Sequence, residues 1–110
     1  MKNLKFQKLL NDQKFISGIH VEGYLTFGNA QQFKNELIDA GNNPNEQLQI
    51  TFSGIEDIDL SCLQLIVAFL KLMETQQISC RLNWNIDKEQ LLFLESVGLS
   101  EELLMNDSYV

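Results

Sequence analysis

The sequence predicts one α/β domain, spanning residues 1–110, in which helices cover a small mixed β-sheet. Its 110 residues, 45% of them apolar, are enough for a single hydrophobic core. Segments with the two-residue period of strands alternate with segments of helical period, in the order β-β-α-β-α-β-α-α. Strands that are separated by helices are expected to pair in parallel, through right-handed crossovers.

The first two elements are expected to be strands. Leu4–Leu10 has the length of an edge strand, and Asn11-Asp12-Gln13 has the composition of a turn. Residues 14–27 are rich in β-branched and aromatic side chains, which favour a long strand. Gly18 and Gly23 within it are candidate positions for a bulge or a close backbone approach.

The first helix is expected to begin after Asn29, with Gln32 completing a capping box. Gly41 is the expected stop, and residues 42–45 are expected to form a loop. The apolar residues of this helix share one face: Ala30, Phe33, Leu37 and Ala40.

The second half of the chain continues the alternation. Residues 47–52 alternate as a strand does, and Gly54 is expected in the turn that follows. A helix is predicted from about Ser61 to Glu74.

Three further elements complete the prediction. Residues 77–84 alternate as a strand, and Asp87 is placed to cap a helix that Gly98 ends. Residues 100–102 are expected to start a short helical turn, and residues 105–110 to form a frayed tail.

Charge excludes several function classes. The net charge is −7, from 15 acidic and 8 basic residues, and the basic residues do not cluster. Nucleic acid and anionic membrane surfaces are therefore not expected as partners. No apolar run reaches the ~20 residues of a membrane span, and the N-terminus lacks a signal-peptide core, so a cytoplasmic protein without membrane insertion is expected.

The sequence offers no constellation for catalysis. The only histidine, His20, lies inside a predicted strand, and no phosphate-binding loop is present. Cys62 and Cys80 lack metal-ligand spacing and are expected to be buried thiols in a reducing compartment, although the sequence leaves a disulfide open. We therefore expect no enzyme, no cofactor and no metal site.

The predicted helix over residues 61–74 has more apolar surface than one sheet face requires. At 100° per residue, one side forms the core stripe, and only Gln64, Lys71 and Glu74 are polar. A separate flank is apolar as well: Leu65, Ala68 and Leu72. Either neighbouring helices cover this flank, or it belongs to a protein–protein interface.

The start of this helix also has two interpretations. Ser61 can be an N-cap with Gln64 at the third position, or Asp59 can cap the helix instead. Ser61 would in addition be a phosphorylation target at a helix start, where a phosphate could act as a switch.

The chain resembles the STAS domain, a family that contains bacterial anti-sigma factor antagonists and the cytoplasmic domains of sulfate transporters. The family motif Asp-Ser-Ser/Ala-Gly-Leu, followed by a helix, is similar to Asp59-Leu60-Ser61-Cys62-Leu63. Glu95-Ser96-Val97-Gly98-Leu99 resembles the family's third-helix ending. Further resemblance lies in residues 15–24, 29–37 and 49–52, so it covers nearly the whole chain.

The resemblance implies a partner-switching function. Antagonists of this type bind an anti-sigma factor that is also a serine kinase, and phosphorylation of the first hydroxyl residue after the motif aspartate stops binding. Leu60 occupies that position here and cannot accept phosphate, whereas Ser61 matches the next position and Cys62 replaces the glycine.

We therefore expect a non-enzymatic protein-binding module in signal transduction that lacks the usual phospho-switch. Its expected partner-binding residues lie along one helix: Asp59, Leu60, Ser61, Gln64, Leu65, Ala68 and Leu72. The alternative implied by the resemblance is a cytoplasmic accessory subunit of a membrane lipid-transport ATPase. The sequence leaves a homodimer open.

Overall fold

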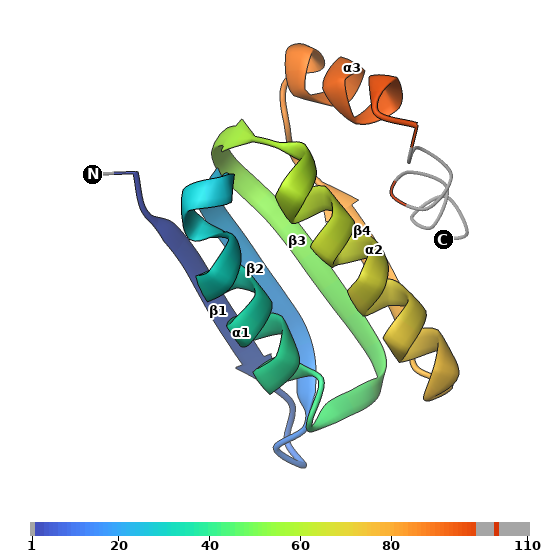
Figure 1. The fold of residues 1–110 in the computed structure, drawn as a ribbon. Helices are drawn as coiled ribbons and strands as arrows, with labels where there is room; N and C mark the ends of the chain where they lie inside the picture. The colour runs from blue at the N-terminus through green and yellow to red at the C-terminus, as the bar shows by residue number, and fades with distance from the viewer. Residues whose placement is uncertain (1, 99–102, 104–110) are drawn as a thin grey trace.

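The computed structural model describes residues 2–98 and residue 103 (Figure 1). Within these residues the chain forms a four-stranded sheet and three α-helices. The strands are β1 (Leu4–Leu10), β2 (Ile16–Leu25), β3 (Pro44–Ile58) and β4 (Ser79–Trp84). The helices are α1 (Ala30–Ala40), α2 (Leu60–Thr75) and α3 (Lys88–Ser96), with a 3-10 turn, η1 (Phe27–Asn29), before α1.

The sheet has the strand order β1-β2-β3-β4. β1 is antiparallel to β2, whereas β2 is parallel to β3 and β3 is parallel to β4. α1 and α2 lie side by side on one face of the sheet, and α3 lies beyond the end of β4 (Figure 1). The predicted mixed α/β class and the parallel pairing of strands separated by helices are confirmed.

The hydrophobic core lies between the sheet and the α1–α2 layer. Along β3, Leu48, Ile50 and Phe52 are buried on the helix side, while Gln49 and Thr51 lie on the opposite side. This alternation is typical of a sheet with only one covered face. The opposite side of β3 therefore carries polar side chains at these positions.

Glycines of β2 lie where strands approach closely, as expected from the sequence. Gly23 has a φ of +100°, and a Cβ at this position would lie 2.3 Å from the carbonyl oxygen of Asn3. At Gly18 a Cβ would lie 3.2 Å from Leu9 Cδ1. β2 itself is shorter than the predicted 14–27, because Lys14 adopts a φ of 65° and Phe27 enters η1.

The prediction of a turn at Gly54 is wrong, because β3 continues through this residue to Ile58. The register of β2 and β3 shifts here, since Val21 pairs with Phe52 while Gly23 pairs with Ile55. Gly54 has a φ of +59°, which accommodates the extra residue of this irregularity.

The capping box predicted for α1 is also wrong. Asn29 does precede the helix, but its side chain makes no capping hydrogen bond. Its amide donates instead to the carbonyl oxygens of Tyr24 and Lys2, and the Gln32 amide donates to Leu4. Both side chains thus join the start of α1 to the strands, a contact that depends on tertiary structure.

The last described elements follow the prediction more closely. Asp87 and Gln90 form a capping box at the start of α3, and Gly98, with a φ of +81°, follows the end of this helix. β4 begins at Ser79, two residues later than predicted, since Gln77 adopts a φ of 61°. The turn expected at residues 100–102 and the tail expected at 105–110 lie outside the described residues.

Candidate protein-binding surface at the start of α2

Asp59 links the start of α2 to the corner between β2 and α1. Its carboxylate accepts a hydrogen bond from the backbone N–H of Phe27 at 2.6 Å and another from the Ser61 hydroxyl. Its own backbone N–H donates to the carbonyl oxygen of Leu25 at 2.9 Å. One side chain therefore fixes the position of two neighbouring loops.

The geometry decides between the two predicted N-caps. Asp59 occupies the N-cap position with an extended backbone, and α2 begins at Leu60, but the Asp59 carboxylate makes no capping hydrogen bond to the helix backbone. The prediction of Ser61 as N-cap is therefore wrong, because Ser61 already lies in the first helical turn. The Ser61 side chain is half-buried and bonded to the Asp59 carboxylate.

Cys62 packs beneath this corner. Its side chain is fully buried, and its thiol lies 3.5 Å from the carbonyl oxygen of Thr26. Burial, with a smaller contribution from the Asp59 carboxylate, raises the pKa of the Cys62 thiol to about 11. The thiol is therefore uncharged near neutral pH and fills space in the core, as expected, whereas Cys80 in β4 is only partly buried.

α2 presents one buried and one exposed side. The core stripe consists of Cys62, Leu63, Ile66, Phe69 and Met73, all buried. On the flank, Leu65 is half-buried and packs against the core, whereas Ala68 is exposed and Leu72 is 45% exposed. The neighbouring elements thus cover part of the apolar flank and leave the rest in solvent.

The predicted binding residues all lie in α2 or directly before it. Asp59, Leu60 and Ser61 form its beginning, and Leu60 is 42% exposed. Leu65, Ala68 and Leu72 follow at spacings of three and four residues, which places them on one side of the helix, with exposed Gln64 beside them. Leu60, by contrast, lies about 120–140° around the helix from Leu65 and Leu72. The structure therefore groups Leu65, Ala68 and Leu72 on one flank of α2 and places Asp59, Leu60 and Ser61 at the start of the helix.

Phe27 is a further exposed apolar residue near the start of α2, and the sequence did not single it out. Phe27 is 78% exposed, and its backbone is bonded to Asp59 at the start of α2. In sequence it continues the β-prone pattern of residues 14–27, so periodicity alone gave no sign that its ring faces solvent. The only available signal was Gly28-Asn29, a pair typical of a turn.

The chain matches the family model of the STAS domain over residues 11–109. It belongs to the STAS domain family. STAS domains are in general protein-interaction modules without enzymatic activity. No curated protein matches the chain.

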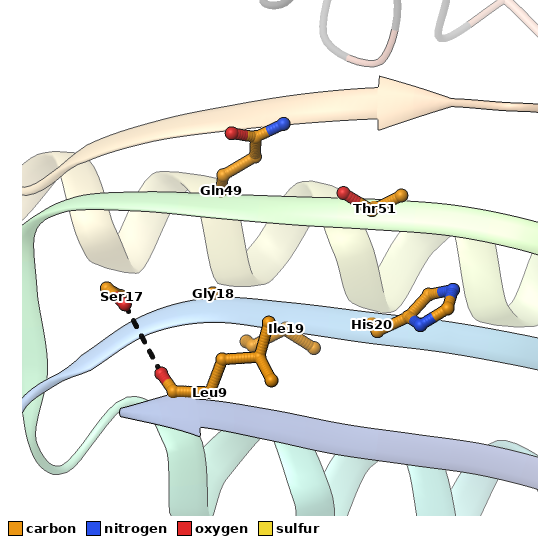
Figure 2. Close-up of a pocket in the computed structure, with 7 residues that line it drawn as sticks. All are labelled: Leu9, Ser17, Gly18, Ile19, His20, Gln49 and Thr51. Carbon is orange, nitrogen blue, oxygen red and sulfur yellow. Dashed lines mark hydrogen bonds between the residues drawn. The ribbon is translucent and has the colours of Figure 1, made fainter. Parts of the chain in front are cut away.

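The helix-free sheet face of this STAS domain carries a shallow hollow of about 370 Å³. Its lining comes from β1, β2 and β3: Leu9, Ser17, Gly18, Ile19, His20, Gln49 and Thr51 (Figure 2). The His20 Nε2 atom lies 2.5 Å from the Ser53 hydroxyl oxygen, in a single histidine–hydroxyl contact. In the described part of the chain no three acidic, histidine or cysteine side chains are placed to hold a metal ion.

None of the described helices of the STAS domain is both long and apolar enough to span a bilayer.

Proposed function

We propose that this STAS domain is a non-enzymatic protein-binding module that acts like an anti-sigma factor antagonist and lacks the usual phospho-switch. The observation that carries the proposal is the exposed apolar flank of α2 at Ala68 and Leu72, together with Leu60, which is exposed at the start of the same helix. Exposed apolar side chains in a continuous surface are typical of protein–protein interfaces.

The identity of residue 60 supports the proposal that the phospho-switch is absent. It follows Asp59 directly and takes the place of the phosphorylated hydroxyl residue of the family motif. A phosphate would add about two negative charges at this point, whereas the 42% exposed leucine adds apolar surface. A partner that packs on Leu60 would therefore stay bound when a kinase and ATP are present.

The environment of Ser61 argues against its use as a substitute. Its hydroxyl is half-buried and bonded to the Asp59 carboxylate. A phosphate on Ser61 would break this bond and bring its charge next to the carboxylate, so like-charge repulsion would oppose the modification.

The proposed contact surface contains the seven residues that the sequence predicts. The apolar contacts come from Leu60, Leu65, Ala68 and Leu72, and the polar rim from Asp59, Ser61 and Gln64. An apolar centre with a polar rim is the usual anatomy of a protein interface.

The test uses a purified anti-sigma factor serine kinase from the same organism. We expect the chain to bind the kinase with equal affinity with and without ATP, and its intact mass to stay unchanged. The variant Leu60→Ser restores a hydroxyl at the motif position, and it should gain one phosphate and then lose binding.

Two results would contradict the proposal. One is a stoichiometric phosphoprotein from the unmodified chain that Ser61→Ala abolishes. The other is a chain that does not bind the kinase and co-purifies with the subunits of a membrane lipid-transport ATPase.

A further inference from the structure

A second hollow lies beside the one that Gly18 helps to line, on the sheet face that no described helix covers. The first hollow measures about 370 Å³ (Figure 2) and the second about 270 Å³. Ser17 and Gln49 belong to the walls of both, so the two hollows join into one depression that reaches from β1 to β4. Their size is near the lower end of the range of small-molecule sites, which is about 300–1,000 Å³.

The absence of a side chain at Gly18 opens the middle of this depression. The strand register sets four residues in one row across the sheet: Leu9, Gly18, Gln49 and Arg81. A Cβ at Gly18 would lie 3.2 Å from Leu9 Cδ1, so a larger residue would fill the gap between Leu9 and Gln49. The row therefore has an apolar wall at β1, an open centre at β2 and a polar, positively charged end at β3 and β4.

Arg81 carries the one permanent charge in the walls of the depression. It is exposed on β4, and its alternation with buried Leu82 places it on the same face as Gln49. No acidic residue lines either hollow, although the net charge of the chain is −7. The described residues form a single ion pair, between Lys8 and Asp39, so Arg81 has no carboxylate partner among them. The depression is therefore locally positive and favours an anion.

The neighbouring carboxylates lie outside this positive region. Asn45 and Gln47 both line the second hollow, so strand alternation places Glu46, between them, on the other side of β3. Glu22 is on the same sheet face, but the register sets it opposite Lys5 of β1, beyond the walls of both hollows. An anion in the depression thus meets no carboxylate in its walls.

Amide and hydroxyl groups complete the walls. Gln49 and Thr51 line the first hollow (Figure 2), and Gln47 and Ser79 line the second. None of these four side chains has a hydrogen-bond partner in the described part of the chain, whereas His20 is engaged by the Ser53 hydroxyl. Amide and hydroxyl groups can both donate and accept hydrogen bonds. The walls can therefore bond a ligand that carries several hydroxyl groups.

We propose that this depression binds a small hydroxylated organic anion, of the class of sugar phosphates and sugar acids. The Arg81 guanidinium pairs with the phosphate or carboxylate, for which its planar fork is suited. Gln49 and Thr51 bond hydroxyl groups of the ligand body. The site goes beyond the proposed protein-binding function, because it lies on the sheet face opposite α1 and α2.

The test is an NMR titration of the ¹⁵N-labelled chain with glucose 6-phosphate and with gluconate. Uncharged glucose is the matched control, since it has the hydroxyl groups without the anionic head. We expect the amide signals of Gly18, Gln49 and Arg81 to shift with at least one of the anions, and the better of the two identifies the head group. Glucose should bind at least about tenfold more weakly, because it lacks the charge-assisted hydrogen bonds.

Variants of the chain test the role of each wall. Arg81→Gln should weaken the anion about tenfold or more, and Arg81→Lys should restore part of the loss, because it keeps the charge without the fork. Lys34→Gln is the matched control, since it removes the same charge from exposed Lys34 of α1, on the other side of the sheet, and should change nothing. Thr51→Val keeps the shape but not the hydroxyl, so it should weaken binding several-fold.

The proposal is overturned if neither anion shifts the signals of the depression at millimolar concentration, or if glucose binds as tightly as the anions. It is also overturned if Arg81→Gln binds like the unmodified chain. Equal weakening by Arg81→Gln and Lys34→Gln would contradict it as well, because net charge alone would then account for binding. The titration contains no protein partner, so its result is independent of whether the chain binds a kinase.

Discussion

The carboxylate of Asp59 accepts a hydrogen bond from the backbone N–H of Phe27 at 2.6 Å, across 32 positions of sequence. This bond joins the β2–α1 corner to the first turn of α2. Since the same carboxylate accepts the Ser61 hydroxyl, it fixes the polar and apolar parts of the proposed surface relative to each other.

Replacing Asp59 should therefore destabilise the domain. Asp59→Ala leaves the Phe27 N–H and the Ser61 hydroxyl without their acceptor, and we expect a loss of about 1–3 kcal/mol in the free energy of unfolding. Urea denaturation followed by circular dichroism measures this loss. Asp12→Ala, which removes an exposed carboxylate in the β1–β2 turn, is the control and should change stability by less than about 0.5 kcal/mol. Equal stability of the two variants would show that the Asp59 bonds contribute nothing.

Alanine substitutions at Gly23 and Gly28 test the close approach of β1 and β2, with Gly28 as the control. Gly23→Ala places a Cβ 2.3 Å from the Asn3 carbonyl oxygen at a φ of +100°, so β1 must move. We expect a loss of about 2 kcal/mol or more in thermal or urea unfolding. Gly28→Ala meets no atom within 4 Å and should be close to neutral. A Gly23→Ala domain as stable as Gly28→Ala would contradict the described β1–β2 pairing.

Phe52 and Trp84 form a stacked pair between β3 and β4. Their ring centroids are 3.9 Å apart with an interplanar angle of 11°, and Phe52 is fully buried. Phe52→Leu should cost about 2 kcal/mol, through lost volume and lost ring contact. Unfolding followed by the fluorescence of Trp84, the single tryptophan, measures this cost. An unchanged unfolding midpoint would be inconsistent with the stacked geometry.

Ionisation of the buried Cys62 thiol should lower the stability of the domain at alkaline pH. Burial raises the pKa of its thiol from 9.0 to about 11, so the folded state keeps this proton to higher pH than the unfolded chain. The stabilisation is present in full below pH 9 and is lost as pH rises through about 11.

The measurement compares urea unfolding below pH 9 with unfolding near pH 11. Cys62→Ala lowers stability at both pH values because it leaves a cavity, but its loss between them should be smaller than that of the unmodified chain. Cys80, whose pKa burial raises to about 12, is present in both proteins and cancels in the comparison. If the unmodified chain and Cys62→Ala lose the same stability between the two pH values, the Cys62 thiol has the same pKa in the folded and the unfolded state.

The sequence alone was sufficient for the architecture, because periodicity and turn chemistry report local preferences. The α3 capping box of Asp87 and Gln90 lies within four consecutive residues and was predicted correctly. Asn29 and Gln32 have the same pattern, yet their amides bond to strand carbonyls that are distant in sequence. A capping pattern in the sequence therefore does not specify which hydrogen-bond partner the side chain has in the folded domain.

The candidate surface was predicted in part for the same reason. The apolar excess of α2 follows from helical spacing, so Ala68 and Leu72 could be found from the sequence. Phe27 could not, because its exposure depends on how the Asp59 carboxylate holds the corner. Gly54 was misplaced because its irregularity arises from the register of β2 against β3.

The most direct test of the central claim is the affinity of an anti-sigma factor serine kinase for Leu72→Asp and for Leu10→Asp, measured by titration calorimetry. Leu72 is 45% exposed on α2 and Leu10 is 59% exposed at the end of β1, so both variants should fold. We predict that Leu72→Asp weakens binding at least about tenfold and that Leu10→Asp leaves it unchanged. Equal affinity of both variants and the unmodified chain would contradict the claim that the exposed side of α2 binds the partner.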